Sequence, residues 1–594
     1  MSRLPDSKRV APRSLTPATL GLGLSVLAAF GALIPFVEGQ PPARRANPTD
    51  QPAAAVQADD PHIGDGSLDA VDIVFFGEGF AYNDCFNCHH TDLKSDDPRL
   101  EGQRRILVED DGILGNGQYE TWFNLDKHEI AHASVSGPAG QAIIATLGYT
   151  EDQVRARCLI CHSPPGALPE PKLMVEQAEK RQVLIGQGVG CESCHGPAEK
   201  WYNPHAQSEF NGKTVSERAK SGFLDTRNPL AASERCANCH VGKGIESPNL
   251  PATPTSAEDS PHWLVTHDMY AAGHPPLPGF EVVGFARNEP KHWRWLAEKK
   301  FNDTYARHYM NELGFDERAV FDAYAAREQS HWSLLGGLVA FREAMRVMAA
   351  ELDRTAAHST QINEWAFLDC TTCHHELKRD DWRQDLADRR RAPGRIPFAS
   401  WQSTFVDLAI EALDEPERAQ RREEWNQRRA DLVGAFVIRP FGDARAVRDL
   451  ARDLARFARD LADEFWKGIR SGKLTLDDAD LKRLLARIAV LADPGADRPP
   501  LDFDSARQLA FASLVLLNEI APDQRGPGHA QALEALQSLR GPLHLVIENK
   551  RQAAKRSTPP DSPYVPAVKD RLSRQADYDP RAVAPAFRTL ANAL

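Results

Sequence analysis

The sequence has no cysteine outside a set of short paired motifs, so no thiol is left to join distant segments by a disulfide bond. All 10 cysteines of the 594-residue chain fall into Cys-x-x-Cys pairs. In an oxidising compartment, unconstrained cysteines usually form disulfides that hold a small domain together. Pairing this tight instead indicates a local chemical role for each pair.

The chain also lacks an excess of positive charge. Its formal net charge is -12, from 71 lysines and arginines against 83 aspartates and glutamates. Nucleic-acid-binding domains usually carry a basic patch and a high pI, so we expect no nucleic-acid partner. Hydrophobic residues make up 42% of the chain, which is ordinary for a globular protein and allows a core to form.

A histidine follows every cysteine pair directly. Motifs one to five contain Cys85 and Cys88, Cys158 and Cys161, Cys191 and Cys194, Cys236 and Cys239, and Cys370 and Cys373. Cys-x-x-Cys-His is the attachment signal of c-type haem, in which the thiols bind the porphyrin and the histidine binds the iron. The proximal ligands are then His89, His162, His195, His240 and His374. The sequence therefore predicts five covalently bound haem c groups.

Structural zinc is the main alternative for Cys-x-x-Cys pairs. A four-cysteine zinc site needs pairs of pairs, and this chain has an odd number of pairs. Zinc also gives no reason for a histidine after each pair. A thioredoxin-type redox motif would need a βαβ context, which is absent around these pairs. We therefore favour haem.

The N-terminus carries an export signal. Four basic residues, the last of them Arg13, precede an uncharged and mostly apolar stretch at 18–37. A cleaved signal peptide has an apolar core of about 7–15 residues, whereas a spanning helix needs roughly 20. No good cleavage site follows, so we expect residues 1–39 to anchor the chain in the inner membrane, with a cleaved signal peptide as the alternative. Either one places the remainder in the periplasm.

Composition divides the remainder into three parts. Residues 40–69 are rich in Pro, Ala, Gln and Asp, which predicts a flexible linker. Residues 70–395 hold all five motifs and form the expected cytochrome domain, which is loop-rich and contains a long helix at 319–354. Residues 396–594 lack cysteine and show helical periodicity, which predicts an α-helical bundle. We expect a mainly α protein whose bundle docks a redox partner or a second copy of the chain.

Local signals place individual helices. A helix at 119–135 would put His128 and His132 on one face, and Pro138 and Gly148 would bound the next. Thr475 with Asp478 resembles a capping box. Further helices are expected at 505–520, 529–540 and 543–554.

The distal ligands decide between electron transfer and catalysis. A haem with two histidine ligands suits electron transfer, whereas an open sixth position lets a substrate bind. The candidates for the distal position are His128, His132, His205, His267 and His274. If their segment is helical, His267 and His274 share a face roughly 10 Å apart, which suits ligands to two different irons. His331, on the long helix, is a reserve for the motif-five haem.

Several motifs in residues 70–395 resemble those of one family. They are Trp122-x5-His128, the segment Gly188–Gly196 with His205 after it, and Cys236–Val241. The chain is similar here to the cytochrome c-552/c-554 family, which includes the tetrahaem partner of hydroxylamine oxidoreductase and shares haem packing with pentahaem nitrite reductases. Those reductases carry Lys in place of His in one motif. None of the five motifs here does, which argues against ammonia-forming nitrite reduction.

The resemblance implies which histidines share an iron. The implied pairs are His205 with His89, His128 with His240, and His274 (or His267) with His195. The resemblance also implies a five-coordinate haem at His162. It gives no distal ligand for His374, because motif five is an addition to the tetrahaem pattern.

The favoured function is a periplasmic electron carrier that passes electrons between redox partner proteins through five haems. The chain has 20 histidines, which leaves a surplus over the proximal ligands to supply distal ones. The alternative is an oxidoreductase that acts on a small nitrogen or sulfur species at one five-coordinate haem. No catalytic side chain is assigned.

Overall fold

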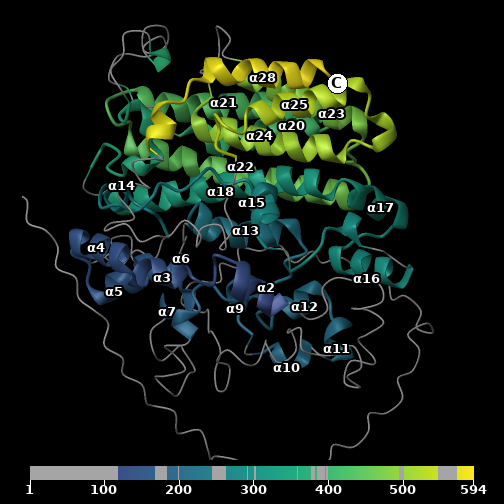
Figure 1. Ribbon diagram of the computed structural model, residues 1–594, viewed down its shortest axis with the longest axis horizontal. Coiled ribbons are helices and arrows are strands. Elements are labelled where there is room, and N and C mark those ends of the chain that lie inside the picture. Colours follow the sequence, from purple (N-terminus) through teal and green to yellow (C-terminus); the bar gives the residue numbers. More distant parts are fainter. Residues whose placement is uncertain are drawn as a thin grey trace, which may run out of the picture. The chain divides into compact units, whose positions relative to one another are not determined.

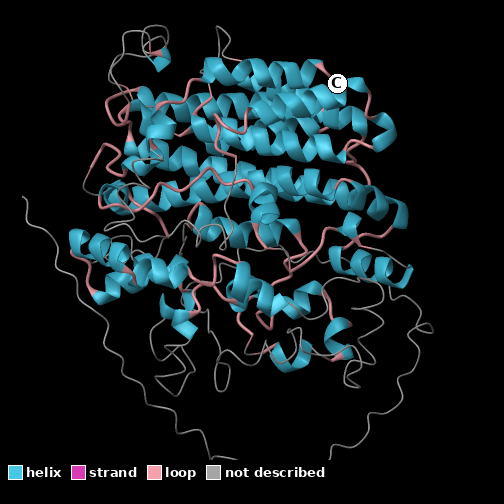
Figure 2. Cartoon of the chain, in the orientation of Figure 1, coloured by secondary structure: helices cyan, strands magenta, loops and turns pink. Residues whose placement is uncertain are grey.

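The computed structural model describes 118–167, 184–198, 200–205, 207–243, 263–290, 292–299, 303–356, 359–375, 381–383, 395, 399–493, 501–545 and 572–594. These residues are mainly α-helical and contain no strand (Figure 2), which confirms the predicted fold class. An isolated bridge joins Lys243 and Trp263. The predicted anchor and linker lie outside the described residues, as does motif one with its histidine His89.

Short helices precede the bundle and carry motifs two to four (Figure 1). They are α2 (Gln118–Leu125), α3 (Ala131–Ser136), α4 (Pro138–Leu147), α5 (Glu151–Val154), the π-helix η4 (Arg155–Leu159), α6 (Ile160–His162), α7 (Pro164–Ala167), α9 (Cys191–His195), α10 (Tyr202–His205), α11 (Ser208–Asn211), α12 (Val215–Ala219) and α13 (Pro229–His240). The helices that follow are α14 (His267–Ala271), α15 (Val282–Asn288), η6 (Leu296–Glu298), α16 (Asp303–Leu313) and α17 (Arg318–Ala326).

Longer helices form the bundle. They are α18 (Glu328–Ala356), α20 (Thr404–Ala412), α21 (Glu417–Val437), α22 (Ala444–Arg470), α23 (Asp478–Ala492), α24 (Phe503–Glu519), α25 (Pro527–Ser538) and α28 (Pro580–Asn592). Single 3-10 turns lie between them at η7 (Trp365–Phe367), η8 (Cys370–Thr372), η9 (Ser400–Ser403) and η10 (Pro522–Gln524).

Helix α18 is the centre of the packing. It contacts α13 on one side and α20, α22 and α24 on others. Its apolar stripe includes Leu338, Phe341 and Met345, each fully buried. A fully buried side chain of this size contributes about 1.5–3 kcal/mol, so α18 fixes the motif-four helix α13 against the bundle.

The bundle helices begin where the sequence supplies a cap. The Asp443 carboxylate accepts hydrogen bonds from the first backbone N–H groups of α22, the usual role of an N-cap aspartate. The capping box of α23 is formed by Asp477 and Asp480, so the prediction that paired Thr475 with Asp478 was two residues early. An acidic cap that accepts from the third helical N–H serves as well as threonine.

Two predicted helices are each divided. The helix expected at 319–354 is α17 and α18, separated at Arg327, whose backbone leaves the helical region. The helix expected at 119–135 is α2 and α3, with a turn between them. His128 and His132 therefore do not share one helix face. Helix α4 has the predicted bounds, with Pro138 at its start and Gly148 left-handed at φ 64°.

All described residues fall in one compact unit. Helix α18, on the cytochrome side of the predicted boundary at 396, packs closely on α22 from the other side, while the boundary itself stays a prediction. Helices α24 and α25 lie within two residues of their predicted bounds, and the helix expected at 543–554 falls mostly outside the described residues. Among the described helices, none combines the length and the apolar character needed to cross a membrane.

Candidate haem sites

Each described motif lies at a helix end or on a single turn. Motif two begins in the π-helix η4 and ends in α6, motif three forms α9, motif four ends α13, and motif five begins with η8. Asn228 caps α13 and Pro229 occupies its first turn, where a missing N–H costs nothing. Gly196, directly after motif three, has φ +84°, and a Cβ there would lie 2.0 Å from the Gly222 carbonyl oxygen. Only glycine allows the chain to turn away from motif three at this point.

Seven of the eight described motif cysteines are half-buried and Cys373 is exposed, and none of the eight forms a disulfide. Burial raises the pKa of Cys194 to about 12 and that of Cys370 to about 12. The side chains of Cys161 and Cys239 hydrogen-bond to each other, so the attachment points of motifs two and four adjoin.

The motif-four histidine faces a second histidine. The ring centres of His240 and His128 are 6.2 Å apart at an interplanar angle of 79°. His128 Nδ1 lies 3.1 Å from Asp126 Oδ1. Burial alone would lower the pKa of His128, but the hydrogen bond and charge of Asp126 raise it to about 9. At neutral pH the free His128 ring is therefore protonated, and a metal at Nε2 would displace that proton while Nδ1 keeps its contact with Asp126, the usual arrangement of a ligating histidine.

Asp126, His128 and Glu289 could alternatively share a divalent ion, since their ligand atoms lie within 4.8 Å of one another. The position of His128 opposite a motif histidine favours haem iron instead. Phe280 stacks on the His240 ring at 5.6 Å, and burial lowers the pKa of His240 to about 3. A histidine kept neutral in this way can donate its lone pair to a metal.

The motif-two histidine also faces a second histidine. His162 and His274 have ring centres 6.2 Å apart at 77°. His162 Nδ1 lies 3.1 Å from the Ala131 carbonyl and 2.8 Å from Ser134 Oγ, while His274 Nδ1 donates to the Pro275 carbonyl at 2.8 Å. Both rings are thus held through Nδ1, the contact by which a ligating histidine is usually oriented toward its metal.

This second pair corrects two expectations that came from the family resemblance. His274 lies opposite His162, where the resemblance paired it with His195. His162 was expected to lack a distal partner, and in the structure the His274 ring faces it. The physical reason is the position of α14, which packs against α4 and so brings His274 to the motif-two side.

A third pair forms at motif five. His374 and His267 have ring centres 6.5 Å apart at 30°. The indole of Trp365 contacts the His267 ring at 5.1 Å and stacks on Phe441 at 5.5 Å. His331, the reserve for this haem, is elsewhere: it is buried against Tyr324 with Nδ1 donating to the Arg327 carbonyl. Its position inside α18 turns it toward the bundle core.

The three separations test whether one metal ion fits between the rings. A histidine nitrogen binds a transition metal at about 2 Å and the ring centre lies roughly 1 Å behind it, so two histidines on one ion have ring centres about 6 Å apart. Edge-to-face aromatic pairs span a similar range. The deciding observation is that one member of every pair is the histidine of a Cys-x-x-Cys-His motif.

The remaining predicted ligands have other surroundings. His205 ends α10, contacts Trp201 edge-on and hydrogen-bonds through Nδ1 to the Tyr202 carbonyl. Its proposed partner His89 lies outside the described residues. His195 ends α9, and its backbone carbonyl accepts from Leu224 N–H. His132 lies on α3, and burial lowers its pKa. Their assignments as ligands stay predictions.

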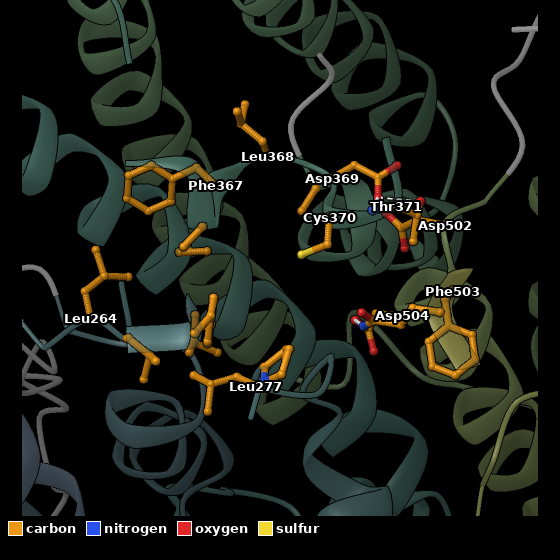
Figure 3. A pocket seen from close by; sticks show the side chains of 18 of the residues that line it. Leu264, Leu277, Phe367, Leu368, Asp369, Cys370, Thr371, Asp502, Phe503 and Asp504 are labelled. Atoms are coloured by element: carbon orange, nitrogen blue, oxygen red, sulfur yellow. Dashed lines mark hydrogen bonds between the residues drawn. The ribbon is translucent and has the colours of Figure 1, made fainter. Parts of the chain in front are cut away.

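A cavity of about 90 Å³ adjoins motif five (Figure 3). Its lining includes the motif-four His240 and the motif-five Cys370, so it lies beside two of the sites. Apolar side chains such as Leu264 and Phe367 form one part of its wall. A second part is acidic and comes partly from the bundle.

Sequence reasoning missed Asp126 and the bundle residues of this cavity. Asp126 stands two residues before His128, and an acidic residue that close to a candidate ligand is a signal that could have identified it. The cavity residues Asp502 and Asp504 had no such signal, because they lie in a part of the chain without any motif.

The three histidine pairs at Cys-x-x-Cys-His motifs are an arrangement typical of c-type cytochromes. Residues 116–196 match the family described as cytochrome c554 and c-prime. A 117-residue stretch is 37% identical to cytochrome c-554 of Nitrosomonas europaea and covers 18% of this chain and 46% of that protein. The chain thus spans about half the length of this relative. No solved structure matched the chain. The matched region is thus similar to cytochromes of the c-554 type, and this similarity supports haem as the group that the Cys-x-x-Cys-His motifs hold.

Proposed function

We propose that this protein is a periplasmic electron carrier in which five haem c groups pass electrons between redox partner proteins. The observation that carries the proposal is the set of three facing histidine pairs, with ring separations of 6.2, 6.2 and 6.5 Å. Two axial histidines close both faces of a haem, which favours electron transfer over substrate binding. When bound, haem c supplies reversible one-electron chemistry at its iron.

The protein's own groups contribute rigidity and exclusion of water. Asp126, the Ala131 carbonyl and the Pro275 carbonyl each engage the Nδ1 atom of one ligand histidine. Side chains fixed in this way reorganise little when the charge at the site changes, and such outer partners tune the metal they surround.

The adjacency of the motifs supports a continuous path. Cys161 of motif two hydrogen-bonds to Cys239 of motif four, and one cavity is lined by both His240 and Cys370. Motifs two, four and five therefore follow one another in space. Motifs one and three, each with a distal ligand, would complete the proposed set of five haem sites.

We further infer that residues 1–39 anchor the protein in the inner membrane or direct its export, because haem c is attached outside the cytoplasm. The basic flank before the apolar stretch supports this orientation. The partners would be redox proteins, with a second copy of the chain as a possible neighbour of the bundle.

Electron paramagnetic resonance of the oxidised, haem-loaded protein tests the proposal. We expect mainly low-spin signals, because paired histidines give a strong ligand field. His274→Ala should convert one haem from low-spin to high-spin, whereas the control His544→Ala, in the bundle, should change nothing. High-spin signals from most haems, together with turnover of nitrite or hydroxylamine, would instead establish the oxidoreductase alternative.

A further inference from the structure

The acidic wall of the motif-five cavity consists of three carboxylates from distant parts of the chain. Asp369 precedes Cys370 directly, while Asp502 and Asp504 lie at the start of α24. All three line the cavity together with Cys370, and Figure 3 shows Asp369, Thr371 and Asp502 grouped to one side of its thiol. Like charges this close to one another favour partial neutralisation.

A buried group without a partner adds an independent observation. The Gln575 side chain is 5% exposed and lines the same cavity. Its Nε2 donates to Asp504 Oδ2 at 3.3 Å, but its Oε1 accepts no hydrogen bond. An unpaired acceptor buried beside carboxylates lacks a donor, and a proton bound in this cluster would help to supply one.

A metal ion is the rival occupant. Carboxylates and an amide oxygen are typical calcium ligands. Among the described residues, however, the ligand atoms close enough to share an ion belong to Asp126, His128 and Glu289, which are not part of this cavity. The acidic wall is therefore too widely spread for one ion, and a proton is the occupant that the geometry favours.

Asp502 is the member best placed to bind it. Its Oδ2 accepts from Ser400 N–H at 2.9 Å and from Ser400 Oγ at 2.7 Å, and its Oδ1 accepts from Ser505 N–H at 2.7 Å. Removal from water, followed by the charge of Asp369, outweighs these donors, which favour the anion, and raises the pKa of Asp502 to about 6. Asp502 is half-buried, so the carboxylate can still exchange protons with solvent.

Charged groups around Asp502 do not neutralise it. Asp504 has the nearby Arg507 guanidinium at 3.5 Å, while Arg383 lies over the Trp382 ring and pairs with Asp381. From the C-terminal segment, the buried Tyr578 has its pKa raised by its own burial and by the charge of Asp502. Arg507 and Arg383 thus pair with other carboxylates, and Asp502 faces the negative charge of Asp369.

We propose that Asp502 is a redox-linked proton site: its carboxylate binds one proton from solvent when one electron is added at the motif-five haem site. This inference rests on the proposed electron-carrier function. The electron comes from a redox partner protein, and the proton forms an O–H bond on Asp502, so charge is conserved at the site. Linkage requires the reciprocal effect, in which protonation favours reduction.

The direction of the pH dependence follows from the carboxylate. Below about pH 6 Asp502 is protonated in both redox states, so the potential of this haem should not change with pH. Above that pH the oxidised form carries the anion and reduction brings a proton with it. The potential should therefore fall as pH rises.

Potentiometric titration of the haem-loaded full chain between pH 5.5 and 8 tests the proposal. Asp502→Asn keeps the shape and cap acceptor but removes the charge, so one potential should become more positive at pH 8 and lose its slope. Proton uptake during reduction by dithionite at pH 7, followed with an indicator dye, should decrease. The matched control Asp477→Asn, at the exposed cap of α23, should behave as the wild type.

A second variant keeps the test informative if Asp502→Asn does not fold. Asp504→Asn removes a neighbouring negative charge, so the slope should persist but begin at lower pH. Identical slopes in Asp502→Asn and Asp477→Asn would overturn the proposal, as would binding of Ca²⁺ by the wild type that abolishes the slope. Neither outcome would affect the low-spin spectra on which the carrier function depends.

Discussion

The motif-bearing helices and the bundle differ in what stabilises them. Within residues 118–228, the small apolar cluster of Ala198, Trp201 and Phe210 stands apart from the main core. The bundle shares one continuous core that includes Leu338, Phe465 and Leu516. Short helices are unstable on their own in water, so we expect the first region to depend on the proposed haems, whereas the bundle depends on side-chain packing.

Preventing haem attachment should produce the largest difference between the two regions. Without haem, residues 118–228 should become sensitive to protease, while α20–α28 should remain a resistant, helical fragment because its packing rests on apolar side chains such as Phe465 and Leu516. Limited proteolysis with mass spectrometry would show this. Equal protection of both regions in haem-free protein would contradict the comparison.

A substitution that creates a cavity in the bundle core should destabilise the bundle and leave the haem sites unchanged. Phe465, on α22, is fully buried, and Phe465→Ala should lower the free energy of unfolding by about 3–5 kcal/mol. The haem absorption spectrum of the folded protein should not change. The control Phe123→Ala, at a side chain that is 38% exposed, should cost far less in thermal denaturation.

The smallest effect is expected at a helix cap. Asp443→Ala removes the acceptor of the first N–H groups of α22 and should cost about 1 kcal/mol. Asp443→Asn should restore most of that loss, because the amide oxygen still accepts. A loss as large as that of Phe465→Ala in chemical denaturation would mean that Asp443 has a role beyond capping.

The features that could be predicted from the sequence are those that a short stretch of residues determines. The Cys-x-x-Cys-His motifs are contiguous, and the stripe of α22 repeats with a helical period, so neither needs tertiary information. The partner of His162 could not be predicted in this way, because His274 reaches it only through the packing of α14 on α4. The family pattern gave no guide there, since this chain adds motif five and redistributes His267 and His274.

The cavity residues were beyond sequence reasoning for the same reason. Asp502 and Gln575 meet Cys370 only because the bundle folds back on motif five. Nothing near them in the chain resembles a binding motif. The residues that surround a site come from distant parts of the chain, whereas those expected to attach the cofactor are contiguous in the sequence.

The burial of motif four also sets an order of events during biosynthesis. Ala237 and Asn238, between the two cysteines of that motif, are almost completely buried, and α13 packs on α18. An enzyme that joins haem to these cysteines must reach the segment while it is still extended. Haem must therefore be attached before the residues of α18 fold over α13, and delayed attachment would leave a chain that can close around an unmodified site.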